Sequence, residues 1–212
     1  MTHRSLFASG VLAFALALPV AAAAQHGGRI DVPDVPSNLT VDDDQVPYLQ
    51  TRAYGTQNYI CLPAPPPNPV PVPPPPPVAW KLFGPQATLY PSHAPLQIAT
   101  HFLSPNPEEQ GTPRPTWQHS QDGSAVWGRL AQQSTDSNYV ADGAIAWLKL
   151  EAAGTAAGTT GGSLLSQTTF IQRVNTEGGK APAGGCSTTS QIGAIALVPY
   201  STDYFFYRAK EQ

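Results

Sequence analysis

Charged residues are scarce in this sequence. Lys and Arg number 11 and Asp and Glu 14 among 212 residues, so charged residues make up 12% of the chain, about half the usual ~25%. So few charges exclude a coiled coil or a charged, disordered tail. The formal net charge is −3. Because no basic cluster offsets it, the composition argues against nucleic acid and anionic membranes as partners.

Long apolar stretches are missing after the first 24 residues. Residues 1–24 have the parts of a secretory signal peptide: Arg4 in a short positive region, an apolar core over 6–18, and small residues before a cleavage site after Ala24. No later apolar run approaches the ~20 residues of a membrane-spanning helix. The sequence therefore predicts no membrane span after signal removal and a secreted or periplasmic protein.

Cysteine is almost absent. The two cysteines, Cys61 and Cys186, would meet an oxidising compartment after export, where an even pair is typical of a disulfide. Closing so long a loop adds an idealised ~4–5 kcal/mol of stability; the alternative is two buried free thiols. No histidine lies at metal-ligand spacing, and no glycine-rich segment has the pattern of a phosphate loop, so we predict neither a metal nor another cofactor.

Proline, by contrast, is abundant, with 24 residues, and it excludes long helices over much of the chain. Residues 25–47 are polar and proline-broken, which predicts an extended N-terminal arm rather than core. Residues 48–212 form the predicted domain, and 63–78 form a proline-rich loop inserted in it, stiff through its polyproline II conformation.

Short apolar runs bounded by Gly, Pro, Asn and Ser recur along the domain. They cover 56–62, 79–83, 86–90, 96–102, 124–131, 143–151, 164–174, 190–199 and 203–208. No segment after residue 24 shows a helical repeat of apolar residues. Runs of this length with turn residues between them predict a single all-β domain, either a β-sandwich or a β-barrel.

Several short motifs together resemble those of a known family. They include 55–61 (GTQNYIC), 115–117 (PTW), 122–124 (DGS), 145–148 (IAWL), 171–176 (IQRVNT), 198–200 (VPY) and 204–207 (YFFY). The pattern, over roughly 48–208, is similar to that of the family named domain of unknown function 3455. The resemblance implies an exported all-β domain from bacteria or fungi, and it implies no activity.

Candidate catalytic residues are His101 and Asp122. A histidine with a carboxylate and Ser124 nearby suggests hydrolysis, but no G-x-S-x-G elbow is present. The Asp122-Gly123-Ser124 segment is typical of a hairpin turn, and a half-buried histidine is the simpler interpretation of His101.

Aromatic residues are the remaining signal, because exported β domains use exposed rings to stack on sugars. Trp117 and Tyr204 are the candidates for such binding, although core packing explains most aromatic residues in a small β domain.

Three functions remain open. The preferred one is a noncatalytic exported module that binds a cell-envelope component, a polysaccharide or other polymer, or a small apolar ligand. The alternatives are a secreted hydrolase or metal-dependent enzyme that uses His101 with a nearby carboxylate, and a structural envelope protein.

Overall fold

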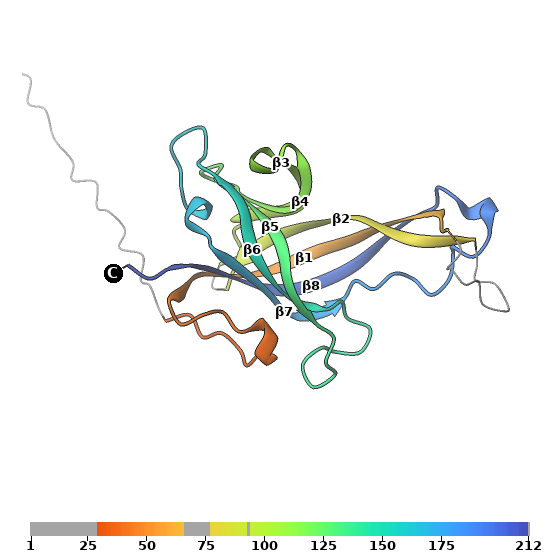
Figure 1. Cartoon of the computed structure of the whole chain (residues 1–212), viewed down its shortest axis with the longest axis horizontal. Coiled ribbons are helices and arrows are strands. Elements are labelled where there is room, and N and C mark those ends of the chain that lie inside the picture. The colour runs from red at the N-terminus through yellow and green to blue at the C-terminus, as the bar shows by residue number, and fades with distance from the viewer. Residues whose placement is uncertain (1–28, 66–76, 93, 212) are drawn as a thin grey trace, which may run out of the picture.

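Eight antiparallel strands form a closed barrel in which each strand pairs with the next and β8 pairs with β1 (Figure 1). The computed structural model describes residues 29–65, 77–92 and 94–211, so the predicted signal peptide and most of the proline-rich loop lie outside the described residues. The strands are β1 (Gln45–Pro63), β2 (Val78–Pro91), β3 (Ala99–Asn106), β4 (Thr112–His119), β5 (Ala125–Ser134), β6 (Trp147–Ala156), β7 (Phe170–Gly178) and β8 (Ile195–Ala209). The all-β prediction is confirmed, and of the two architectures the protein is a barrel.

Two pairs of predicted apolar runs lie in single strands. The runs 79–83 and 86–90 form the single strand β2, because Gly84 takes a φ of +146° and the strand continues through a bulge opposite Asn58 and Tyr59. Residues 195–199 of the run 190–199 and the run 203–208 likewise belong to the single strand β8, whereas the first run begins in a 3₁₀ turn, Thr189–Gln191. The helical elements of the described residues are four short 3₁₀ turns, and no helix among them is long and apolar enough to cross a membrane.

Strand β8 shows how the sequence builds two cores. Its segment Tyr204-Phe205-Phe206-Tyr207 is apolar throughout, and successive side chains of a strand point to opposite faces. Tyr204 and Phe206 therefore join the barrel interior, whose buried members also include Ala53, Ala87, Leu89, Ala99, Trp117, Val126, Leu150, Leu165, Ile171 and Tyr200. Phe205 and Tyr207 join a second core on the outside of the barrel, with Leu39, Val140, Ala144, Trp147 and Val174.

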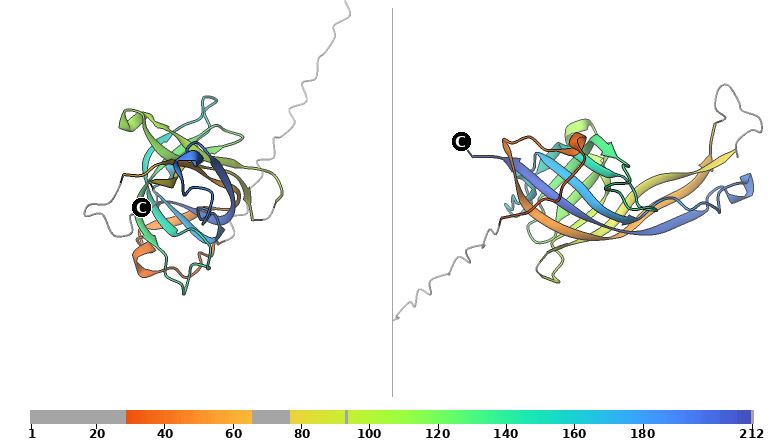
Figure 2. Two further views of the ribbon diagram at one scale, coloured as in Figure 1. Left: turned by 90° about the vertical axis from the view of Figure 1, so that its right-hand side faces the viewer. Right: turned by 90° about the horizontal axis from the view of Figure 1, so that it is seen from below.

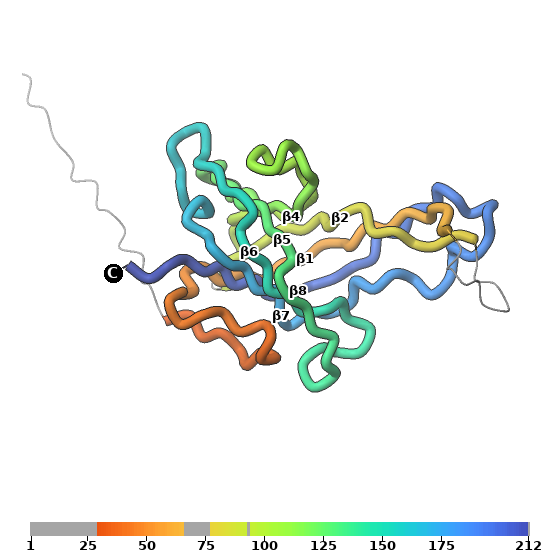
Figure 3. Tube along the Cα trace, in the orientation of Figure 1, coloured from red at the N-terminus to blue at the C-terminus, as the bar shows by residue number. Residues whose placement is uncertain are grey.

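The N-terminal arm covers this outer core. Leu39 is fully buried, and Ile30, Val32, Val35 and Val41 pack against the same cluster. The side chain of Gln172 donates a hydrogen bond of 2.6 Å to the Leu39 carbonyl, and Figure 3 follows the arm along one side of the barrel. Between residue 29 and β1, the arm contains one short 3₁₀ turn, Ser37–Leu39. Leu39 belongs to the core, because it helps to cover apolar side chains of β7 and β8 that would otherwise be exposed.

Three strands project beyond the barrel as a ribbon, which we define as residues 56–63 of β1, 78–86 of β2 and 195–199 of β8, together with the segment 179–194 that runs beside them. The ribbon is the long extension in Figure 2. A disulfide between Cys61 and Cys186, with Cα atoms 5.5 Å apart, confirms the predicted pairing. It fastens segment 179–194 to β1, and the Trp80 indole supports it by donating a hydrogen bond of 2.9 Å to the Gly184 carbonyl.

Candidate functional site

His101, Trp117 and Tyr204 lie together inside the barrel. His101 and Trp117 are directly opposite each other on β3 and β4, and their rings stack with centroids 4.2 Å apart. The Tyr204 ring meets both edge-on, at 5.4 Å from His101 and 5.3 Å from Trp117. Trp117 and Tyr204 are each 1% exposed. A ligand in solution therefore does not reach these two side chains, and the cluster packs the core.

His101 is neutral in this environment. Its Nδ1 atom lies 2.9 Å from the Thr116 carbonyl oxygen, and because a carbonyl only accepts, Nδ1 carries the proton. Burial lowers the pKa of His101 to about 3. The ring is thus an uncharged imidazole between two aromatic side chains throughout the physiological pH range.

Asp122 lies in the turn between β4 and β5. Gly123 takes a φ of +73° there, so the predicted hairpin turn is present. The Asp122 carboxylate accepts hydrogen bonds from the Ser124 amide (2.8 Å), the Ser124 hydroxyl (2.6 Å) and the Leu164 amide (3.0 Å), and His119 Nδ1 is 2.9 Å from it. Burial alone would raise the Asp122 pKa, but these hydrogen bonds together hold the pKa well below its usual range.

The two catalytic candidates belong to separate groups. His101 faces Trp117, whereas Asp122 follows His119, which pairs with Ala99 further along β3. The hydrogen-bond partners of Asp122 come from its own turn and from Leu164, and the ring of His101 bonds to the Thr116 carbonyl. The arrangement holds two segments in place and does not form a nucleophile–base pair.

Several buried polar side-chain atoms in the described part of the chain have no hydrogen-bond partner. They include Gln57 Nε2, Trp117 Nε1 and the hydroxyls of Tyr200 and Tyr204. Burial raises the pKa of both tyrosines, so their hydroxyls stay protonated. A Cβ atom on Gly179 would contact Tyr200, Ile145 and Gln57 at 3.0–3.2 Å. Gly179 and Ile145 thus close the interior where the ribbon begins.

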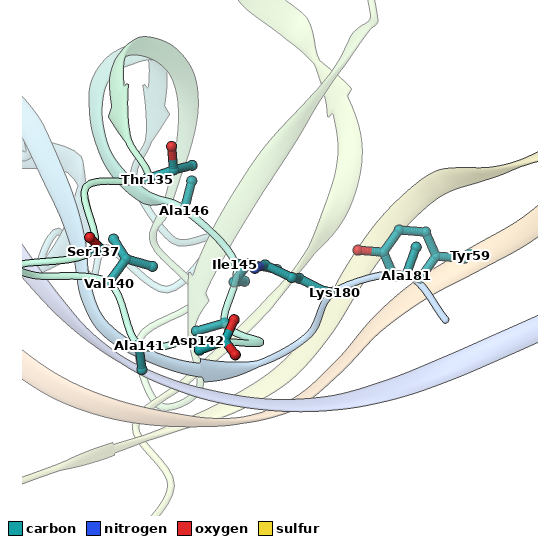
Figure 4. Close-up of a pocket in the computed structure, with 11 residues that line it drawn as sticks. Tyr59, Thr135, Ser137, Val140, Ala141, Asp142, Ile145, Ala146, Lys180 and Ala181 are labelled. Atoms are coloured by element: carbon teal, nitrogen blue, oxygen red, sulfur yellow. The ribbon is translucent and has the colours of Figure 1, made fainter. Parts of the chain in front are cut away.

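A pocket lies on the outer side of this closure (Figure 4). It encloses about 570 Å³. Its lining is mainly apolar with a few polar groups: Tyr59, Thr135, Ser137, Val140, Ala141, Asp142, Ala144, Ile145, Ala146, Lys180 and Ala181. The Tyr59 hydroxyl donates a hydrogen bond of 2.7 Å to the Gly179 carbonyl, so one wall is fixed in place. We call this the mouth pocket.

A cluster of charged groups surrounds Arg52 on the exterior of the barrel. Its guanidinium lies 3.1 Å from Glu177 and 3.3 Å from Asp203, and it donates a hydrogen bond of 2.6 Å to the Ser201 hydroxyl. It also donates to the carbonyl of Asn175 at 3.2 Å. Hydrogen bonding from Ser201 and the charge of Arg52 lower the pKa of Glu177. The carboxylate therefore stays ionised beside a fixed guanidinium.

Asn175 carries backbone strain in this cluster. Its φ is +51°, at a position where β7 shifts register against β8. The Asn175 side chain donates a hydrogen bond of 2.8 Å to Asp203, which holds the strained residue in place. Strain of this kind persists where the surroundings determine the conformation, and it is concentrated at functional sites.

Two tyrosines flank the charged cluster. Tyr54 is 56% exposed, the Arg52 guanidinium carbon is 5.8 Å from its ring centroid, and the Tyr90 ring is 6.2 Å away. With Pro91, Ser92, Ala94 and Pro95 they line an open depression of about 650 Å³. We call this surface the Tyr54 platform. It joins aromatic faces to fixed hydrogen-bonding groups.

Sequence reasoning missed Arg52 and Tyr54 because it predicted no strand before residue 56. The signal was present in the alternation of Thr51, Arg52, Ala53 and Tyr54: the first and third are buried, and the second and fourth face outward. Across the described ranges, no group of three or more His, Cys, Asp and Glu side chains is placed to hold a metal ion.

Comparison with known families gives one match. The model of the family described as protein of unknown function (DUF3455) matches residues 43–208. The chain belongs to the DUF3455 family. The match covers every strand of the barrel except the last residue of β8, Ala209, and it begins slightly before the roughly 48–208 that the resemblance predicted. No curated protein and no solved structure matches the chain, so the function of this DUF3455 protein has to be argued from its own surface.

Proposed function

We propose that this protein is a noncatalytic exported module that binds an envelope polysaccharide at the Tyr54 platform. The observation that carries the proposal is the exposed Tyr54 ring beside the Arg52 cluster. A pyranose presents an apolar C–H face and a rim of hydroxyl groups. An exposed aromatic ring suits the face, and Glu177, Asp203 and Ser201 offer acceptors and donors for the rim.

The order already present in the platform supports binding. Arg52 is fixed by Glu177 and Asp203, and these contacts hold it against the Tyr54 ring. A surface held in its binding geometry loses little conformational entropy when a ligand arrives. The depression at the platform is also open to solvent, so it suits one unit of a longer chain.

The hydrolase alternative has less support than polysaccharide binding. His101 is enclosed and neutral, and its hydrogen-bonded nitrogen is committed to a backbone carbonyl. A general base must come within ~3 Å of the proton it removes, directly or through one water. Asp122 is engaged by Ser124 and Leu164, so neither residue is free for that task.

The mouth pocket supports a second candidate, the binding of a small and largely apolar ligand. Its volume of about 570 Å³ falls within the ~300–1,000 Å³ of ligand pockets, which are mostly apolar with a few placed polar groups. The Tyr59 hydroxyl and the Lys180 amine are the polar groups that would orient such a molecule.

Retention on insoluble polysaccharides tests the main proposal. The exported protein is mixed with peptidoglycan, chitin and cellulose, and the bound fraction is measured for the wild type and for Tyr54→Ala. We expect retention on at least one polymer and a roughly tenfold or greater loss in the variant, which corresponds to ~1.4 kcal/mol.

The matched control is Tyr139→Ala, an exposed tyrosine that lies outside the platform and contacts Trp147. Retention of this variant should equal that of the wild type. Absence of retention on all three polymers, or an equal loss in both variants, would refute the proposal. The Ile145→Trp substitution fills the mouth pocket. If this variant still binds the polymer, the polymer binds at the Tyr54 platform and not in the mouth pocket.

A further inference from the structure

Exposed apolar side chains are concentrated on the ribbon. Eleven large apolar side chains are exposed among the described residues, and six of them lie on the ribbon: Leu62, Leu82, Phe83, Ile192, Ile195 and Leu197. Single exposed apolar residues are normal on a soluble protein, whereas their concentration in one part of the molecule is typical of an interaction surface. The ribbon is therefore a candidate interaction surface.

The apolar side chains occupy both faces of the ribbon. Ile60 pairs with Ile195, and Leu197 pairs with Asn58 two residues away, so Ile195 and Leu197 share one face. Their exposed fractions are 61% and 59%. Leu82 pairs with Tyr59 on the opposite face and is also exposed. A partner that contacts one face leaves the apolar side chains of the other face exposed, whereas a fluid apolar medium can contact both.

The ribbon also differs from the remainder of the chain in charge. Its charged residues are Lys81 and Lys180, and none of the 14 Asp and Glu residues of the chain lies in it. The net charge of −3, which argued against an anionic membrane, is an average over the chain. The local charge of the ribbon is positive and complements an anionic surface.

Unpaired strand edges limit how deeply the ribbon can enter a bilayer. β2 pairs with β3 only over Ala87–Leu89, so its ribbon part has no second neighbouring strand. Open edges do not occur in the hydrocarbon region, because their backbone groups would lose water. The same edge carries Lys81 and Pro85, which disfavour pairing with a second copy of the chain.

We propose that the ribbon binds the surface of an anionic phospholipid bilayer. Its leucine, isoleucine and phenylalanine side chains lie at the boundary of headgroups and acyl chains, and Lys81 and Lys180 contact headgroup phosphates. The disulfide keeps segment 179–194 against β1, so the apolar residues are presented on a stiff support. Binding at the ribbon leaves the Tyr54 platform free.

Co-sedimentation with large vesicles tests the proposal. Vesicles contain phosphatidylcholine and phosphatidylglycerol in equal amounts, or phosphatidylcholine alone. We expect the wild type to sediment with the anionic vesicles and at least fivefold less with the neutral ones. The double variant Ile195→Asp/Leu197→Asp should lose about tenfold or more of its binding, because it replaces apolar contacts with charges of the same sign as the lipid.

The matched control is Leu96→Asp/Leu130→Asp, which places the same charges at positions that are 60% and 52% exposed outside the ribbon. This variant should sediment as the wild type does. Thermal melting of both variants verifies the fold.

Failure of the wild type to sediment with anionic vesicles would overturn the proposal, as would an equal loss in the two double variants. Sedimentation velocity tests the competing occupant, a second copy of the chain. If the wild type is a dimer that does not bind vesicles, and Ile195→Asp/Leu197→Asp dissociates this dimer, the ribbon is an interface between two copies. Polysaccharide retention of the ribbon variants is expected to equal that of the wild type, which keeps this test separate from that of the Tyr54 platform.

Discussion

Asp122 fastens two segments that are distant in the sequence. Its carboxylate accepts the Leu164 amide, and Ser124 in the same turn accepts the Leu165 amide at 3.0 Å. Leu165 is fully buried in the barrel interior. The Asp122 carboxylate, a catalytic candidate in the sequence, therefore helps to hold the Leu165 side chain in the barrel interior.

We predict that Asp122→Asn lowers the free energy of unfolding by about 1–3 kcal/mol at pH 7, because the amide cannot accept all the hydrogen bonds of the carboxylate. The Asp122 pKa is depressed in the folded state, so its stabilisation is complete above the unfolded pKa of ~3.9 and is lost as the pH falls further. Denaturant unfolding between pH 7 and pH 3 measures this.

The control for this prediction is Asp31→Asn, whose carboxylate is exposed near Arg29. Its stability should match that of the wild type at every pH. A wild-type advantage over Asp122→Asn that stays constant down to pH 3 would show that the carboxylate is not the stabilising form.

Among the strands, β1 depends most on one small residue. Gly55 lies where the barrel passes into the ribbon, and a Cβ atom there would be 2.1 Å from the Gln86 carbonyl oxygen and 2.5 Å from the Ala87 Cα atom. Both are backbone atoms of the paired strand β2. The close approach of the two backbones is thus possible only without a side chain.

We expect Gly55→Ala to lower the free energy of unfolding by about 3 kcal/mol, at the upper end of the cost of overpacking, because backbone has to move. Gly184→Ala is the control, since no atom lies within 4 Å of its Cβ position. Thermal and denaturant melting compare the two. Equal stability of both variants would mean that β1 and β2 separate there at little cost.

Proline explains why one strand escaped prediction. β4 contains Pro113 and Pro115, and a proline within a run argues against a central strand. Along β4, pairing with β5 is limited to Thr116–Gln118, so both prolines lie where the strand has a neighbour on one side only. The sequence predicts the class of fold and the disulfide. The position of β4 in the sheet depends on its pairing with β3 and β5, which the sequence does not show.

Two cores, one inside and one outside the barrel, stabilise the molecule as a whole. The outer core exists because the N-terminal arm lies across β7 and β8, and Leu39 is its buried residue from the arm. We predict that Leu39→Ala costs about 2–5 kcal/mol of stability, as for other buried leucines. Leu96→Ala, at an exposed position, should cost less than ~0.5 kcal/mol. A small effect of Leu39→Ala on thermal melting would show that the arm contributes little to the fold.

The candidate site could not be located from the sequence for a related reason. Arg52, Tyr90, Glu177 and Asp203 come from four strands, and the closed register of the barrel brings them together. Trp117 and Tyr204 are aromatic residues like Tyr54, but their side chains are buried. Which aromatic residue meets solvent is decided by strand alternation and closure, and composition does not contain that information.

The most direct test of polysaccharide binding at the Tyr54 platform is a map of amide chemical shifts during titration with soluble oligosaccharide fragments of the polymer that retains the protein. We predict changes centred on Arg52, Tyr54 and Ser92 on the barrel exterior. Changes confined to Ile145 and Lys180 at the mouth pocket, or to His101 in the interior, would contradict it.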